Sequence, residues 1–286
     1  MKIIKYFLEF FIIIILFIIF KILRFELASN IGGYIGKKFG PLFRSKEKIL
    51  SNIKKALPNS NNNDLKLIVE NMWTNYGRIL SEYVFLKDFR KEKLKKYIEI
   101  EGQEHLNNIR NSKEQVVFVS GHFNNFELMA MQIEKSGINL AAIYRPLNNI
   151  FLNVIMEKIR KKHICKNQIK KGRKGTRELL KAFSNKNSIA LMIDQRVSEG
   201  IKSNFFGEHA FTTTIPAQLA KKFGCKIVPI YIERYNNFYF KMKVSEPINY
   251  DKNLSVDDIT LSLNKLLENM ILKNPGQWIW SHNRWK

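Results

Sequence analysis

An apolar segment near the N-terminus constrains the fold of this chain more than any other feature. Residues Phe10 to Phe20 form an unbroken apolar run. The wider segment, residues 3–25, is interrupted only by Lys5, Glu9, Lys21 and Arg24. A bilayer core about 30 Å thick needs about 20 helical residues, and long charged side chains near the ends of a helix can reach the interface. We therefore expect residues 1–25 to form a membrane-anchor helix that spans the bilayer or lies at its interface.

Two alternatives explain an apolar N-terminal segment without an anchor. A cleavable signal peptide is disfavoured, because basic residues continue after the run and no Ala-x-Ala-like cleavage site follows it. A buried core helix is the other alternative. The remainder of the chain has no comparable apolar run, so we expect a single anchor with the rest of the protein outside the bilayer.

The chain is strongly basic. Its 286 residues include 48 Lys and Arg against 25 Asp and Glu, which gives a net charge of +23. Such a surplus favours an anionic partner: nucleic acid, an anionic bilayer surface, a phosphorylated substrate or an acidic carrier protein. Compositional drift in an AT-rich genome is an alternative source of the lysines. The two cysteines, Cys165 and Cys225, are isolated, so neither a zinc site nor a disulfide framework is expected.

The pattern of apolar residues divides the rest of the chain into two parts. Residues 65–86 carry apolar side chains at helical spacing, and we assign residues 26–97 to an N-terminal helical region. From residue 98 to residue 286, strand-like and helix-like segments alternate. The expected strands are residues 115–119, 188–193, 226–232 and 238–244, and the expected helices are residues 124–136, 148–162, 174–185 and 215–223. Ser255 and Asp258 have the spacing of a capping box for a last helix. This alternation predicts an α/β fold with a mixed, mainly parallel sheet flanked by helices.

A histidine follows the first of these buried strands. His122 lies in the loop that leaves the strand, and Glu127 falls in the first turn of the next helix. Ligand sites in open α/β sheets lie at the carboxyl ends of strands. We expect the Glu127 carboxylate to contact one imidazole nitrogen of His122, which leaves the other nitrogen free to take a proton from a hydroxyl group. The alternative is a packed loop histidine and a glutamate that stabilises a helix N-terminus.

Other catalytic motifs are missing from the sequence. It contains no Gly-x-Ser-x-Gly, His-Glu-x-x-His, Gly-x-Gly-x-x-Gly or Walker-type motif. We therefore expect no metal, no nucleotide cofactor and no covalent serine nucleophile.

The residues around His122 resemble the signature of a known family. Gly121-His-Phe-Asn-Asn-Phe-Glu127 is similar to the acyltransferase motif of the bacterial lipid A late acyltransferases, the lauroyl/myristoyl transferase family. Further stretches resemble that family in the same order along the whole chain: residues 144–149, 171–195, 205–207, 212–214, 228–234 and 274–286.

The resemblance implies an activity and a set of site residues. It implies transfer of a fatty acyl chain from an acyl-thioester, on acyl carrier protein or coenzyme A, to a hydroxyl of a phosphorylated glycolipid, the lipid A precursor. His122 would be the general base and Glu127 would orient it. Four residues would contact substrate: Arg145, Asn125, Arg177 and Gln195. The implied fold is glycerolipid acyltransferase-like, and the implied location is the cytoplasmic face of the inner membrane.

Each of these substrate-contact assignments has a simpler alternative. Arg145 also fits a surface arginine before a turn proline, Asn125 a helix cap, and Arg177 an exposed helix position. The same chemistry with another acceptor, a phosphatidylinositol mannoside or a lysophospholipid, is the nearest alternative function. A membrane-tethered anion-binding protein without catalysis is an alternative of a different class, and it rests on charge alone.

Overall fold

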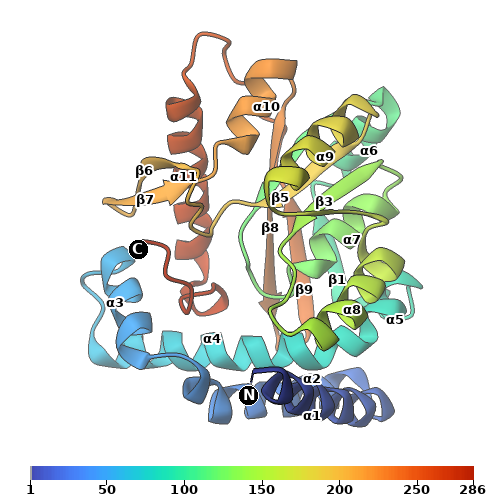
Figure 1. Ribbon diagram of the computed structural model, residues 1–286, viewed down its shortest axis with the longest axis vertical. Helices are drawn as coiled ribbons and strands as arrows, with labels where there is room; N and C mark the ends of the chain where they lie inside the picture. Colours follow the sequence, from blue (N-terminus) through green and yellow to red (C-terminus); the bar gives the residue numbers. More distant parts are fainter. Residues whose placement is uncertain (1) are drawn as a thin grey trace.

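A seven-stranded sheet forms the centre of the protein, for which a computed structural model describes residues 2–286 (Figure 1). The order of the strands is β1-β9-β8-β2-β5-β3-β4. The strands β8, β2, β5, β3 and β4 run parallel to one another, whereas β9 pairs with β8 in the antiparallel sense and β1 follows β9. The prediction of a mixed, mainly parallel sheet is therefore confirmed.

The strands of this sheet have the following bounds: β1 Ile98–Glu101, β2 Val117–Ser120, β3 Leu140–Tyr144, β4 Asn167–Lys170, β5 Ser188–Met192, β8 Ile227–Tyr235 and β9 Tyr239–Val244. A separate antiparallel hairpin consists of β6 Ile201–Phe205 and β7 Glu208–Thr212. The helices of this part are α6 Gln103–Ser112, α7 Glu127–Lys135, α8 Ile150–Ile159, α9 Arg173–Ser184, α10 Ile215–Phe223 and α11 Val256–Lys273. A short π-helical turn, η4, extends α8 over Arg160–Ile164.

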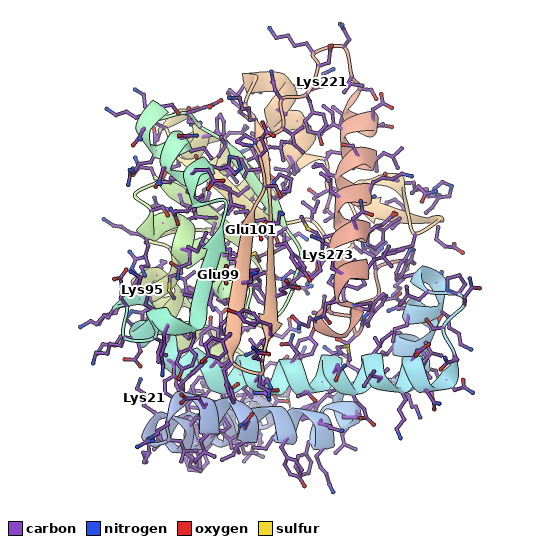
Figure 2. All side chains as sticks on the ribbon, turned by 180° about the vertical axis from the view of Figure 1, so that it is seen from behind. Lys21, Lys95, Glu99, Glu101, Lys221 and Lys273 are labelled. Carbon is purple, nitrogen blue, oxygen red and sulfur yellow. The ribbon has the colours of Figure 1, made fainter. Side chains whose placement is uncertain are left out.

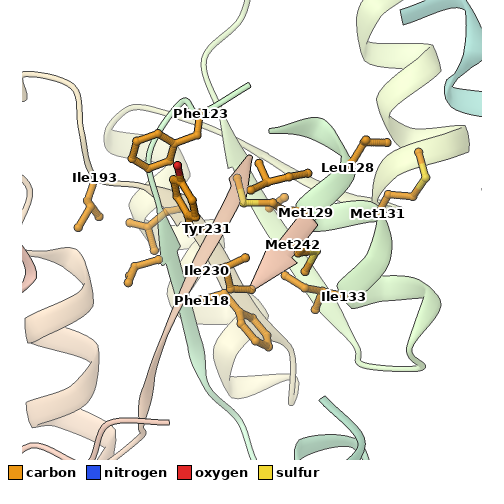
Figure 3. Close-up of a cluster of buried hydrophobic side chains, with 14 of the residues drawn as sticks. Phe118, Phe123, Leu128, Met129, Met131, Ile133, Ile193, Ile230, Tyr231 and Met242 are labelled. Atoms are coloured by element: carbon orange, nitrogen blue, oxygen red, sulfur yellow. The ribbon is translucent and has the colours of Figure 1, made fainter. Parts of the chain in front are cut away.

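The central strands are apolar because they are buried. All of β2 is buried, as expected for a parallel strand with both faces covered. Figure 3 shows the core where Phe118 of β2, Met129 and Ile133 of α7, and Ile230 of β8 come together. The edge strand β1 is different, since its half-buried and exposed positions alternate. Its exposed Glu99 and Glu101 (Figure 2) pair with lysines of β9, and such charges protect a sheet edge against unwanted pairing.

A layer of N-terminal helices lies across one end of the sheet (Figure 1). It consists of α1 Lys2–Ile22, α2 Phe25–Phe39, a 3₁₀ turn η1 Gly40–Phe43, α3 Lys46–Ala56 and α4 Asn62–Glu82. A second 3₁₀ turn, η2 Tyr83–Phe85, and α5 Leu86–Arg90 lead on to η3 Lys95–Tyr97 and the sheet. The helices α2 and α4 cross closely, because a Cβ atom on Gly77 would lie 2.0 Å from the carbonyl oxygen of Gly32. Only glycine at this position permits that approach.

The C-terminal part of the chain returns to the same end of the sheet. The helix α11 begins with the predicted capping box, in which the Ser255 hydroxyl accepts from the Asp258 backbone and the Asp258 carboxylate accepts from the Ser255 backbone. A 3₁₀ turn, η5 Pro275–Gln277, follows and contacts α4. The last residues then bring Trp278 and His282 to the ends of the parallel strands, where the functional site lies.

Candidate active site

The register of two neighbouring strands brings His122 and Asp194 together. The strands β2 and β5 pair in parallel with Ser120 opposite Met192, and His122 and Asp194 follow these strand ends at the same offset. The Nδ1 atom of His122 lies 2.8 Å from Oδ1 of Asp194. The backbone N–H of His122 donates to Oδ2 of the same carboxylate at 2.7 Å. One aspartate therefore holds His122 through both its imidazole ring and its backbone N–H group.

Asp194 is fully buried and remains ionised. Trp278 donates its indole N–H to Oδ2 at 2.9 Å. Burial alone would raise the pKa of Asp194, but the adjacent His122 and the N–H donors from His122 and Trp278 outweigh it and lower the pKa to about 2. An ionised carboxylate only accepts hydrogen bonds, so Nδ1 of His122 carries the proton. In the neutral ring this tautomer leaves Nε2 without a proton, so that Nε2 can act as a base in the cleft that His122 lines.

Glu127 has different partners from those expected. It is the first residue of α7 and is buried, and its Oε1 atom accepts from Nε and Nη2 of Arg160 at 2.8 Å and 2.6 Å. The Tyr83 hydroxyl donates to the same oxygen at 3.0 Å. The predicted contact between Glu127 and His122 is therefore corrected. A buried carboxylate needs a compensating charge, which Arg160 supplies, and Asp194 takes the place beside the imidazole.

Arg160 is a site residue that the sequence did not reveal. It lies where α8 changes into the π-helical turn, and π turns often mark functional positions. Burial lowers the pKa of Arg160, but the charge of Glu127 and its hydrogen bonds with the guanidinium outweigh this effect, so that the pKa is raised and the guanidinium stays charged. Neither the spacing to Glu127 nor the local sequence signals this pair.

His122 and Glu127 line one cleft with a volume of about 500 Å³. Its apolar wall is made by the core side chains of Phe118, Met129, Ile133, Ala142, Met192 and Ile230. Polar groups line the same cleft. Arg145 and Gln195, both predicted to contact substrate, line the cleft, together with Arg44 and Lys171.

The other two predicted contact residues do not line this cleft. Asn125 is buried, and its Nδ2 atom donates to Oε2 of Glu82 at 3.0 Å. It does not cap α7 through its side chain, because Phe126 holds the cap position. Arg177 lies exposed on α9. Substrate contacts by these two residues stay predictions.

A second histidine lines the cleft close to the first. The Nε2 atom of His282 accepts from the backbone N–H of Arg196 at 3.1 Å, so the proton of the neutral ring is on Nδ1. Burial lowers the pKa of His282 to about 4, and the negative charge of the nearby Asp194 offsets only part of this effect. A neutral ring with a fixed tautomer is a hydrogen-bond donor whose charge does not change near pH 7.

These features fit one kind of chemistry. A histidine whose tautomer is fixed by a buried aspartate can remove a proton from a hydroxyl group. The adjoining apolar wall can hold a fatty acyl chain, and cationic groups line the same cleft. An activated acyl donor needs no nucleophilic side chain. The class that the fold and site define is an acyltransferase.

The family can be stated more closely. The family model of the bacterial lipid A biosynthesis acyltransferases matches residues 1–286, and the chain belongs to this family. The predicted activity, acyl transfer in lipid A biosynthesis, is thereby confirmed at the level of the family.

Individual relatives are distant. The lipid A biosynthesis lauroyltransferase of Escherichia coli K12 is 23% identical over 278 residues, which cover 92% of this chain and 87% of the relative. The lipid A biosynthesis acyltransferase of Haemophilus influenzae is 24% identical over 267 residues, covering 88% and 83%. Among solved structures, the 1-acyl-sn-glycerophosphate acyltransferase of Thermotoga maritima matches 90% of this chain and 100% of its own at 10% identity, with a TM-score of 0.42. None of these likenesses assigns a role to a particular residue.

Proposed function

We propose that this protein transfers a fatty acyl chain from an acyl-thioester to a hydroxyl of a lipid A precursor, with His122 as the general base. One observation carries the catalytic part of the proposal. The Nδ1 atom of His122 is bonded to the buried, ionised Asp194, while the ring lines an apolar cleft. We take acyl carrier protein as the donor, because an acidic carrier suits a chain of net charge +23.

The reaction follows from this geometry. Nε2 of His122 removes the proton of the acceptor hydroxyl as its oxygen bonds to the thioester carbonyl carbon. Asp194 stabilises the imidazolium that forms. When the tetrahedral intermediate collapses, the carbon–sulfur bond breaks, and the imidazolium returns the proton to the leaving thiolate. The ester product and the free thiol then dissociate, and the enzyme is back in its starting form.

The oxyanion of the intermediate needs hydrogen-bond donors. Arg145, Gln195 and the Nδ1–H group of His282 all belong to side chains that line the cleft. Arg44, Arg145 and Lys171 supply positive charge there, which suits a phosphorylated acceptor. Partial burial and the nearby Arg145 lower the pKa of Lys171, and the charges of Glu199 and Asp194 offset only part of this effect.

Glu127 keeps a catalytic role in this proposal, but an indirect one. It anchors Arg160 through two hydrogen bonds from the guanidinium and also lines the cleft. Only its Oε1 atom is engaged by Arg160 and Tyr83. We propose that Oε2 positions the acceptor hydroxyl within reach of His122.

The place of action belongs to the same proposal. The apolar helix α1 and the basic surplus suit a membrane bearing anionic lipids, and we propose the cytoplasmic face of the inner membrane.

The test is an acyl-transfer assay with the purified protein in phospholipid vesicles. Wild type should move labelled acyl groups from acyl carrier protein to a phosphorylated, acylated glucosamine disaccharide. Glu127→Gln should lower kcat by at least about 10²-fold if this carboxylate positions the hydroxyl. The exposed His209→Ala serves as the matched control and should act like wild type. Transfer to lysophospholipid but not to the disaccharide would overturn the proposed acceptor.

A further inference from the structure

The apolar helix α1 contacts the rest of the protein at both of its ends. Near its N-terminus, Asn149 at the start of α8 donates to the Tyr6 carbonyl at 2.8 Å and to Oε2 of Glu9 at 3.2 Å. The rings of Phe7 and Phe10 lie 5.8 Å and 5.9 Å from the Phe151 ring. The N-terminal half of α1 is thus fixed to α8.

Near its C-terminus, α1 is fixed to a different segment. The Lys21 ammonium lies 2.5 Å from Oδ2 of Asp88 and donates to the Val84 carbonyl at 3.1 Å. The Phe17 ring stacks on Tyr83 with ring centroids 6.5 Å apart. These partners belong to η2 and α5. Both ends of α1 are therefore attached to the rest of the protein.

This attachment is incompatible with a helix that crosses a bilayer. The 21 residues of α1 measure about 31 Å, enough to span the hydrocarbon core. If α1 stood upright, Asn149 and Asp88 would lie about 20 Å apart along the membrane normal, and the polar segments between them would lie in hydrocarbon. Polar backbone and charged side chains exposed to lipid are too unfavourable for that arrangement.

The free face of α1 is nevertheless apolar. Its exposed side chains include Ile4, Leu8, Phe11, Ile15, Ile18 and Ile22. The helix α2, which lies at the same end of the molecule as α1 (Figure 1), and the turn η1 after it also expose apolar side chains: Leu27, Tyr34, Phe39, Leu42 and Phe43. Exposed basic residues of the same helices accompany it, among them Lys2, Lys5, Arg24, Lys37 and Lys38. An apolar face with basic residues around it matches an anionic bilayer surface.

We propose that α1 lies in the plane of an anionic bilayer, with its apolar face at the boundary between headgroups and acyl chains, and does not span it. This inference builds on the proposed membrane location and replaces the spanning anchor by an interfacial one. The arrangement has a consequence for the substrate. Arg145 to Asn148 line the cleft and lead directly into α8, on which α1 packs. The cleft then opens near the membrane surface, and a lipid acceptor reaches His122 while its acyl chains stay in the bilayer.

A depth measurement along α1 tests the orientation. Ile4, Phe11 and Ile18 are exposed and follow one stripe of the helix, because successive members are seven residues apart and about two helical turns span that distance. Each would be replaced in turn by cysteine and labelled with a fluorophore; Cys165 and Cys225 are buried and escape labelling. The labelled protein would be bound to phosphatidylglycerol–phosphatidylethanolamine vesicles that carry nitroxides at carbon 5 or carbon 12 of the acyl chain.

An in-plane helix predicts the same quenching ratio at the three positions, with the carbon-5 nitroxide the stronger quencher at each. An upright helix places Phe11 near the bilayer centre, about 10 Å deeper than Ile4 and Ile18, and that profile would overturn the proposal. Absence of quenching at all three positions would overturn it too, since α1 would then not meet lipid. Neither readout requires acyl transfer, so failure of the proposed function would leave this result unaffected.

A cross-linking measurement in the same vesicles shows whether α1 stays on α8. Cysteines at Phe7 and Phe151 should be joined by a short bis-maleimide when the enzyme is bound to membranes. The pair at Phe7 and the exposed Leu254 is the control and should not react. Cross-linking of the first pair in detergent but not in vesicles would mean that α1 leaves the protein to cross the bilayer.

Discussion

Asp194 and Glu127 are both buried carboxylates, and their partners give them different tasks. Asp194 receives N–H donors from His122 and Trp278 on its two oxygens, so its charge acts on the imidazole. Glu127 is neutralised by Arg160 through Oε1, so its charge acts mainly on the guanidinium. Different strands and helices thus hold Asp194, the carboxylate beside the proposed base, and Glu127, the proposed positioning carboxylate.

Some contacts between individual residues of the site can be predicted from the local sequence, and others cannot. The position of His122 after a buried strand can be predicted from the local sequence. Its partner cannot, because Asp194 lies 72 residues further along the chain and only the register of β2 against β5 brings the two together. Asp194 lies in one of the stretches that resemble the family, but the local sequence does not indicate that it pairs with His122. Arg160 is a comparable case, since no local pattern connects it with Glu127.

His282 gives a prediction about pH at this scale. Its pKa is lowered to about 4 in the folded protein, against an ordinary value of 6.5. The folded state therefore favours the neutral ring. The stability that this ring contributes is complete above pH 6.5 and is lost as the pH falls from 6.5 toward 4, where the unfolded chain takes up the proton. His282→Gln keeps an acceptor for the Arg196 N–H group but cannot be protonated.

Thermal unfolding at pH 7, 6 and 5 measures this effect. Between pH 7 and pH 5, the melting temperature of wild type should fall further than that of His282→Gln. His209→Gln controls for the loss of one exposed histidine and should follow wild type. Parallel curves for wild type and His282→Gln would mean that His282 is not held neutral by the fold.

At the level of elements, a continuous apolar run predicts a strand well but not always. The expected strands at 188–193 and 238–244 appear as β5 and β9, with bounds that shift only at their ends. The strands β1, β4, β6 and β7 were not predicted, because their sequences lack a continuous apolar run. The prediction also missed β3, although its sequence is apolar and mostly buried. The predicted helix at 65–86 ends at Glu82, where the chain tightens into η2 and so brings Tyr83 to Glu127.

The crossing of α2 and α4 supports a prediction about stability. Gly77→Ala would place a methyl group 2.0 Å from the Gly32 carbonyl oxygen and 2.7 Å from the Gly36 Cα atom. The helices must separate, so the variant should lose about 1–3 kcal/mol of stability, as is usual for overpacking. Lys66→Ala on the exposed face of α4 should change stability by less than about 0.5 kcal/mol. Equal melting temperatures for these two variants in thermal unfolding would contradict a close helix crossing.

At the level of the whole molecule, the membrane-facing layer is connected to the site. Phe17 of α1 stacks on Tyr83, the Tyr83 hydroxyl donates to Glu127, and Glu127 holds Arg160. The carboxyl ends of the parallel strands therefore face the layer that we propose to lie on the bilayer. A chain of net charge +23 brings this end toward anionic lipid and toward an acidic donor protein. The fold, the net charge and the site thus all suit catalysis at a membrane surface.

We propose that His122 acts as a base because Asp194 holds it. A double-mutant cycle of kcat for acyl transfer tests this directly, with His122→Ala, Asp194→Asn and the double variant assayed beside wild type. Each single variant should lower kcat by about 10²–10⁴-fold. The double variant should be no slower than His122→Ala alone, because Asp194 has no task once the imidazole is gone. Wild-type kcat in folded Asp194→Asn, or losses that multiply in the double variant, would contradict the account.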